Sequence, residues 1–306
     1  MNKSYDEATM TARFAITCTL IFAVLILWMP APGQSAVSND NADTVYRIET
    51  VDGTTTVGRL IREDDDAVVL YVEGLGEVTI RRDNIREITE LDETAFVRGT
   101  YWYPNPHATR YLFGPNALPL GRRMGYYQNT WIFFNNVNYG VTERFSMGVG
   151  MVPLFLFGVG QTPAWLLPKI SLPLGTDQLN ISAGAMFGGV IGSGFGGVGL
   201  LYGNLTFGGR NSNISAGLGY GYVDDGLSDR PSVNIAGMHR LSQRYYIITE
   251  NYFFPSGDGD YNAVGSLGLR YAPESFAVDF ALVRPEGVGG DFIGIPWLGV
   301  SIPFSR

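Results

Sequence analysis

Five charged residues lie in segments where apolar residues alternate with small or polar ones. This alternation is typical of β-strands with one apolar face, and each of these charges falls on the opposite face. If the apolar face meets lipid, an Arg or Lys turned toward that lipid at mid-depth costs about 2–4 kcal/mol. We therefore expect the five to face an enclosed interior, either lining a pore that they make selective or pairing with one another: Lys169, Arg240, Glu250, Arg270 and Asp279.

Common cofactor and metal motifs do not occur in the sequence. Gly192, Gly194 and Gly197 match the spacing G-x-G-x-x-G, but no helical period follows them, so the match is interpreted as a loop. The one cysteine, Cys18, excludes an internal disulfide and a cysteine-based zinc site. Five aspartates in predicted loops have no fixed ligand spacing and are interpreted as solvated: Asp224, Asp225, Asp229, Asp258 and Asp260. We predict no cofactor and no metal site.

Alternation with a period of two residues repeats through the second part of the chain. In residues 276–282, for example, phenylalanine, valine and leucine alternate with alanine and aspartate. The pattern predicts about twelve strands, near residues 108–115, 126–141, 145–159, 165–174, 178–191, 197–208, 212–223, 232–241, 244–254, 262–271, 275–284 and 292–304.

The predicted connections fall into two classes that alternate along the chain. Glycine-rich or acidic loops such as DDGLSDRP alternate with tight turns such as TER, GTD and APE. Membrane barrels have this asymmetry, and their even strand number puts both barrel ends on one side. No predicted connection exceeds about ten residues, so we expect no plug built from the barrel's own loops.

The last predicted strand, in IPWLGVSIPFSR, carries an aromatic residue near its end, Phe304. With the alternation and the connections, it resembles bacterial outer-membrane β-barrel proteins, and residues 105–153 are similar to those of an uncharacterised group of them. The family ends on an aromatic residue, whereas Ser305 and Arg306 follow here. The resemblance implies an outer-membrane barrel over residues 98–306, surrounded by lipid and inserted by machinery that reads the strand ending at Phe304.

The two histidines are weak candidates for catalysis. Lipid-hydrolysing barrels place His and Ser two residues apart, but Ser242 lies three residues after His239. A catalytic triad also needs a third, orienting group. His239 is therefore interpreted as a residue at the membrane interface, with a lipid hydrolase as a weaker alternative, and His107 as a turn residue. The chain is not expected to be an enzyme.

The N-terminal residues have the order of a secretory signal. Arg13 precedes an uncharged apolar run from Phe14 to Met29, and Pro30 ends it. The run is slightly short for a spanning helix, which needs about 17–25 residues. We predict a signal peptide over residues 1–36 and export across the inner membrane.

Residues 43–94 are predicted to form a small acidic β domain. From Val37 to Thr94 there are 6 Arg and 15 Asp or Glu, a net charge of 6 − 15 = −9, whereas Ala95–Arg306 has 13 basic and 12 acidic residues. Asp52-Gly53 between two strand-like segments predicts a hairpin. The five predicted strands resemble a small SH3-like or Sm-like barrel, and the negative charge disfavours nucleic acid as a partner.

The sequence thus predicts an all-β protein: an antiparallel transmembrane β-barrel of about twelve strands, preceded by a five-stranded SH3-like domain in the periplasm. A passive pore for small solutes is the first functional expectation. The alternative is a structural barrel whose periplasmic domain docks another envelope protein or the cell wall.

Overall fold

The computed structural model describes residues 44–91, 96–97, 100–192, 194–224, 226–257, 259–288 and 292–305. The predicted signal peptide, residues 1–36, and two of the loop aspartates, Asp225 and Asp258, lie outside them. No helix among the described residues is long and apolar enough to cross a bilayer. The described residues divide into two compact units between Pro104 and Asn105, and each unit is described by itself.

The first unit is a five-stranded antiparallel sheet with the order β4-β3-β2-β1-β5. The Asp52-Gly53 turn is present, and Gly53 takes the left-handed conformation that such a turn requires, with φ of 86°. Ile48, Val68 and Leu70 are buried in its core. The strands are β1 (Val45–Thr50), β2 (Thr55–Glu63), β3 (Ala67–Val72), β4 (Gly76–Arg81) and β5 (Ile85–Leu91), with the short 3-10 helix η1 (Arg82–Asn84) before β5.

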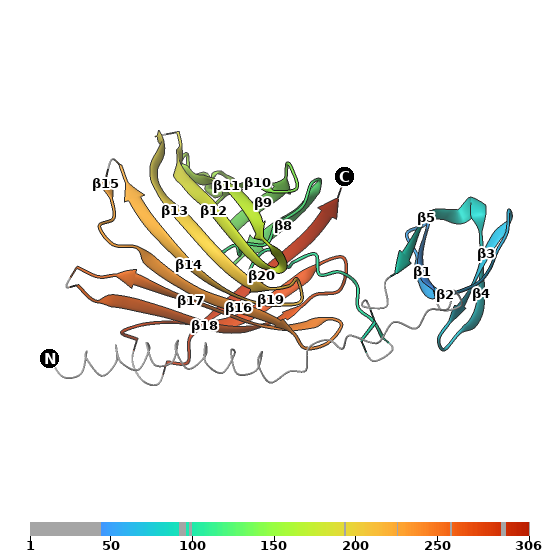
Figure 1. The fold of residues 1–306 in the computed structure, drawn as a ribbon. Helices are drawn as coiled ribbons and strands as arrows, with labels where there is room; N and C mark the ends of the chain where they lie inside the picture. Colours follow the sequence, from blue (N-terminus) through green and yellow to red (C-terminus); the bar gives the residue numbers. More distant parts are fainter. Residues whose placement is uncertain are drawn as a thin grey trace. The chain divides into compact units, whose positions relative to one another are not determined.

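The second unit is a closed antiparallel barrel of twelve strands (Figure 1). Neighbouring strands pair in chain order, and the ring closes where Ser301 of the last strand lies opposite Gln128 of the first. The strands are β8 (Met124–Thr130), β9 (Phe134–Gly140), β10 (Phe145–Met151), β11 (Thr162–Leu174), β12 (Thr176–Ile191), β13 (Gly194–Gly208), β14 (Ser212–Val223), β16 (Ser232–Arg240), β17 (Tyr245–Pro255), β18 (Tyr261–Tyr271), β19 (Ala277–Pro285) and β20 (Ile295–Ser305).

Three two-residue strands and a second 3-10 helix complete the described elements. They are β6 (Phe96–Val97), β7 (Thr100–Tyr101), β15 (Gly226–Leu227) and η3 (Leu154–Phe157). None of them extends the ring of twelve strands, although β15 pairs with the end of β14.

The barrel has an apolar outer face and a polar inner face. On β20, Leu298 and Ile302 are 49% and 48% exposed, whereas Ser301 between them is fully buried. Because successive side chains of a strand point to opposite faces, the same alternation repeats around the ring. Closure of the sheet leaves no open strand edge in lipid, and the apolar exterior is the face that lipid contacts.

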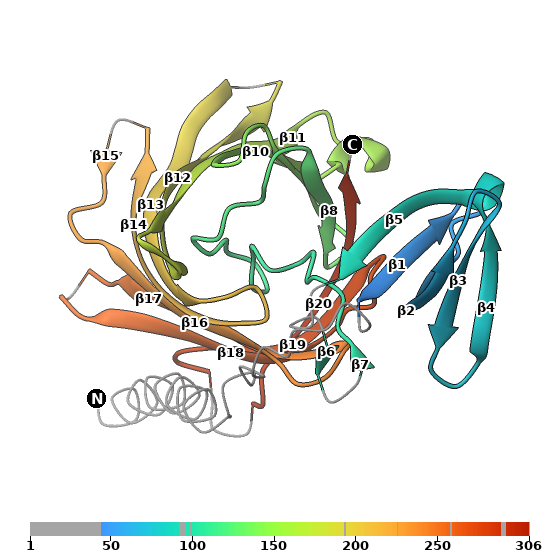
Figure 2. The ribbon, with the colours of Figure 1, turned by 45° about the vertical axis from the view of Figure 1, so that its right-hand side comes forward.

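The predicted first strand, residues 108–115, is wrong: no strand forms there, and residues 105–120 lie inside the ring (Figure 2). We call residues 105–120 the plug. The expectation that the barrel's own loops build no plug holds for the described residues, because the plug comes from the segment before the first strand. A plug formed by that preceding segment was not predicted. The predicted segment 126–141 is two strands, β8 and β9, so the total remains twelve.

We predict that the full chain, folded in detergent, migrates anomalously on a gel until it is boiled. The reason is that a closed ladder of backbone hydrogen bonds resists the detergent at room temperature. Unheated and boiled samples compared by gel electrophoresis check this, and identical migration of the two would contradict the closed barrel.

Candidate functional site

The plug folds back on itself without joining the sheet. The backbone N–H of Tyr111 donates to the carbonyl of Gly114 at 3.0 Å, and that of Asn116 donates to Thr109 at 3.1 Å. The side chain of Asn116 accepts the N–H of Leu118 at 3.0 Å. Asparagine favours such local bonds over regular structure. The result is a compact loop whose tip points into the lumen.

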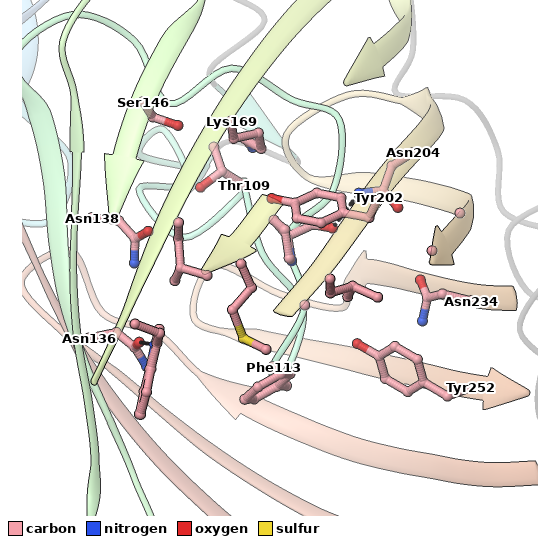
Figure 3. Close-up of a pocket in the computed structure, with 18 of the residues that line it drawn as sticks. Thr109, Phe113, Asn136, Asn138, Ser146, Lys169, Tyr202, Asn204, Asn234 and Tyr252 are labelled. Carbon is pink, nitrogen blue, oxygen red and sulfur yellow. Dashed lines mark hydrogen bonds between the residues drawn. The ribbon is translucent and has the colours of Figure 1, made fainter. Parts of the chain in front are cut away.

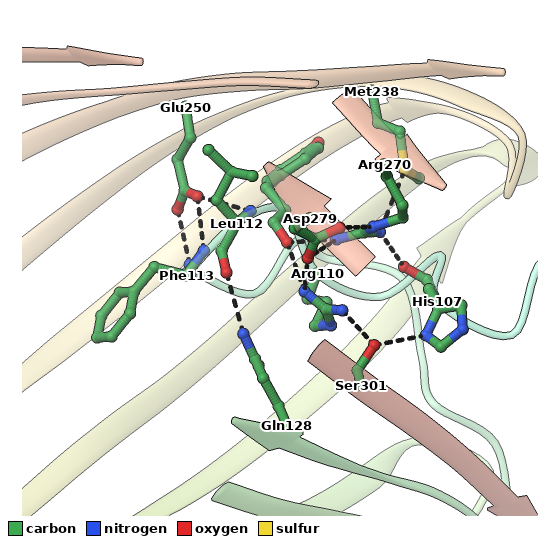
Figure 4. A network of polar contacts seen from close by, with 12 residues as sticks. His107, Arg110, Leu112, Phe113, Gln128, Met238, Glu250, Arg270, Asp279 and Ser301 are labelled. Carbon is green, nitrogen blue, oxygen red and sulfur yellow. Dashed lines mark hydrogen bonds and ion pairs between the residues drawn. The ribbon is translucent and has the colours of Figure 1, made fainter. Parts of the chain in front are cut away.

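The carboxylate of Glu250, in β17, holds the tip of the plug (Figure 4). Its Oε2 accepts the backbone N–H groups of Leu112 at 2.9 Å and Phe113 at 2.8 Å, and its Oε1 accepts that of Gly114 at 2.6 Å. The hydroxyl of Tyr252 also donates to Oε1, at 2.5 Å. Hydrogen bonds to a charged acceptor are stronger than those between neutral groups. These four bonds therefore replace the water that the buried carboxylate has lost.

Asp279, in β19, joins the plug to the wall through two arginines (Figure 4). Its Oδ2 lies 2.9 Å from a terminal nitrogen of Arg110, in the plug, and its Oδ1 lies 2.5 Å from Nε of Arg270, in β18. Arg270 also donates to the backbone carbonyls of His107 and Tyr111, at 3.1 and 2.7 Å. One carboxylate thus sits between two guanidinium groups that are themselves anchored to the plug backbone.

Lys169, in β11, binds the plug from the opposite wall. Its Nζ donates to the carbonyls of Asn116 and Leu118, both at 3.0 Å. Between them, the N–H of Ala117 donates to Oγ1 of Thr206, in β13, at 2.8 Å. Contacts from β11, β13, β17, β18 and β19 therefore fix the plug on both sides.

Arg240 lies at the end of the barrel where the plug enters. It donates to the side chain of Asn211 at 2.9 Å and to the carbonyl of Gln243 at 2.7 Å. Its guanidinium also stacks 5.3 Å from the ring centre of Tyr246. These bonds tie together the connections after β13 and β16.

The five charges predicted from the sequence all lie on the inward side, where each is at most 6% exposed. Arg270 and Asp279 pair with each other across β18 and β19. Glu250 and Lys169 bind plug backbone, which was not expected, and a role of these five in solute selectivity stays a prediction.

Sequence reasoning missed Arg110 and the plug itself. His107 lies in a turn, as interpreted from the sequence, and this turn is buried in the plug, where His107 is 1% exposed. Four prolines in residues 104–119 are a weak signal against a strand, since β11 forms in the ring although it contains Pro163, Pro168 and Pro173.

A cavity of about 290 Å³ remains beside the plug (Figure 3). The plug supplies one wall through Thr109, Phe113 and Pro115. Much of the rest comes from strand positions next to the longer connections, such as Trp165 of β11 and Phe254 of β17. The open part of the lumen thus lies on the side of the longer loops, and the plug blocks the other side.

His239 pairs with a serine other than the one predicted. Its Nδ1 lies 2.7 Å from Oγ of Ser212, its neighbour on β14, and not beside Ser242. His239 alternates with the buried Met238 and Arg240, so it faces outward. Within the described residues, no group is bonded to its Nε2, so the pair lacks the orienting partner of a catalytic triad.

We predict that Asp279→Asn lowers the stability of the barrel by about 3–5 kcal/mol, since it leaves the guanidinium groups of Arg110 and Arg270 uncompensated in a buried site. Urea unfolding of the detergent-folded protein measures the loss. Asp229→Asn, in an exposed loop, is the matched control and should stay within about 0.5 kcal/mol of the parent. Equal midpoints for the two variants would show that the Asp279 network does not hold the fold.

We also predict that the plugged barrel loses stability as the pH falls below about 6.5. Burial holds the pKa of His107 well below its ordinary value, and the positive charges of Arg110 and Arg270 lower it further. The negative charge of Asp279 raises this pKa, but by less. In the unfolded chain His107 binds a proton near pH 6.5, whereas in the folded protein its imidazole stays neutral at this pH. Acidification therefore lowers the free energy of unfolding. Urea midpoints at pH 7.5 and 5.0 should differ more for the parent than for His107→Gln; equal differences would refute this role of His107.

No family model and no curated protein matches the chain. Among solved structures, it is similar to the KdgM porin, with 8% identity, a TM-score of 0.44 and coverage of 60% of this chain and 99% of the porin.

Two further solved barrels show a weaker likeness. Outer membrane phospholipase A from Escherichia coli has 10% identity and a TM-score of 0.32, covering 61% of this chain and 93% of its own. OmpT of Vibrio cholerae has 11% identity and a TM-score of 0.30, covering 89% and 100%. These values assign no substrate or activity to the chain. Its closed order of twelve antiparallel strands, with an apolar outer face and a polar inner face, gives the chain the fold of an outer-membrane β-barrel.

Proposed function

We propose that the protein is a pore for small solutes in the bacterial outer membrane, held closed by its plug in the state described above. The observation that carries this proposal is the division of the lumen, with a cavity of about 290 Å³ on one side and the plug on the other. A barrel with only a structural role needs no cavity next to its loops.

The plug can leave without breaking the wall. It contributes no strand to the twelve-stranded ring, and its one β-bridge is internal, between Arg110 and Pro115. When the plug moves, polar groups of the inner wall such as Glu250 and Lys169 lose their hydrogen bonds to the plug and form hydrogen bonds to water instead. Because the ladder stays paired, displacement of the plug opens the lumen and preserves the barrel.

The orientation and partners form part of the same proposal. An even strand number puts the entry of the plug and the end of β20 on one side, so residues 43–94 lie in the periplasm. Lipid surrounds the apolar face, and Phe304 on β20 serves the insertion machinery. The acidic domain binds a periplasmic protein or the cell wall, and that partner controls the plug through the chain that joins them.

A structural barrel is the second candidate. It is favoured by the buried apolar contacts of the plug, since Tyr111 and Leu112 pack into a cluster with Met238, Tyr246 and Ile248. A lipid hydrolase at His239 is disfavoured, because its Nε2 has no orienting partner among the described residues.

We predict that the parent protein in planar bilayers conducts little and that Glu250→Gln conducts more. The amide removes the charge that binds three N–H groups of the plug tip, so the plug is released more often. Single-channel recording measures the open fraction, and Asp229→Asn is the control.

A variant with the plug cross-linked to the wall tests whether current depends on movement of the plug or passes through the barrel while the plug stays in place. With Ala117→Cys and Thr206→Cys joined by a short thiol cross-linker in the Glu250→Gln background, conductance should return to the parent level. No current from correctly folded Glu250→Gln would support the structural barrel, and current through the locked protein would refute gating by the plug.

A further inference from the structure

The cavity beside the plug has the lining of a ligand site. We propose that it binds a neutral saccharide of one or two rings; this deepens the proposed pore function by naming its solute class. The volume of about 290 Å³ lies at the lower end of the range for small-molecule sites, about 300–1,000 Å³, which suits so small a ligand.

Aromatic rings supply the flat apolar surfaces of the site. Trp165 lines it from β11. Tyr202 and Tyr252 line it from β13 and β17 (Figure 3). Aromatic side chains combine a large apolar body with a polar tip. The C–H face of a sugar ring packs on such a surface, while the hydroxyls at its edge reach polar groups beside it.

Amides supply those polar groups, and three of them have bonding capacity left. Asn136 uses its Oδ1 to accept from Trp165 at 2.6 Å, which leaves its Nδ2. Asn234 uses its Nδ2 to donate to the carbonyl of Asn251 at 3.1 Å, which leaves its Oδ1. The side chain of Asn138 bonds to none of the described residues. A sugar hydroxyl both donates and accepts, and an amide side chain offers it a donor and an acceptor.

The lining carries almost no charge. It contains no acidic residue among the described ones, and the Nζ of its one lysine, Lys169, is bound to two plug carbonyls. A cation therefore finds no counter-charge, and an anion meets a lysine that already directs its ammonium to the plug carbonyls. Charge thus favours a neutral ligand.

Glycines on the inner face of β10 leave room for the amides. A Cβ on Gly148 would overlap Oδ1 of Asn138, and one on Gly150 would overlap Oδ1 of Asn136 and the indole nitrogen of Trp165. The amides therefore lie flat against a wall without side chains, next to the cavity rather than across it.

Isothermal titration of the detergent-folded full chain tests the site, with maltose, sucrose, galactose and N-acetylglucosamine as neutral probes and galacturonate as the charged one. At least one neutral sugar should bind, and galacturonate should bind more weakly. The double variant N136L/N138L keeps the side-chain volume but removes both amides, so its Kd should rise roughly tenfold or more.

Asn135→Leu is the matched control on the same strand. Asn135 lies on the outer face, where it bonds to Tyr127 and Asn129, and its loss should leave the affinity unchanged. Gel mobility before and after boiling confirms that each variant is folded.

Absence of binding for all four neutral sugars, equal affinity of the double variant, or preference for galacturonate would each overturn the saccharide site. This failure is distinct from that of the pore, because conductance without sugar binding leaves the pore intact. Sugar binding by a protein whose Glu250→Gln variant does not conduct refutes the pore and keeps the site.

Discussion

Two carboxylates inside the barrel, Asp279 and Glu250, set the conditions that the lumen must satisfy. A charge buried within an apolar-faced wall is tolerated only when it is paired and hydrogen-bonded. Asp279 finds one guanidinium on the neighbouring strand and a second on the plug. Glu250 is not paired with an arginine among the described residues, and its carboxylate accepts hydrogen bonds from three backbone N–H groups of the plug tip instead. The wall and the plug therefore complete each other, since each leaves polar groups that the other satisfies.

The same division explains how a rigid barrel can hold a removable element. The ring is fixed by backbone ladders that close on themselves, which depend on no side chain of the plug. The plug is fixed by side-chain to backbone bonds, such as those of Lys169 and Arg270, together with a small apolar cluster around Tyr111. Breaking the second set leaves the first intact, so opening and unfolding are separate events with separate energies.

Much of the wall was predictable from the sequence, because the period of two residues reports directly which side of a strand meets lipid. Alternation such as that around Asp279 indicated the inward position of all five charges. The plug was not predictable in this way, since its conformation follows from partners far along the chain: Arg110 pairs with a residue 169 positions away. The turn after β8 was missed for a local reason, because Trp131 and Ile132 take positive φ values of 49° and 68°, which bulky residues rarely adopt.

Hydrogen exchange of the plug backbone tests the central claim most directly. In the detergent-folded barrel, mass spectrometry should find residues 105–120 protected to nearly the same degree as the strands around them. The amides of Leu112, Phe113 and Gly114 should lose that protection in Glu250→Gln before any strand does. Exchange of residues 105–120 as fast as that of the exposed loop around Asp229 in the parent protein would contradict a lumen closed by its own chain.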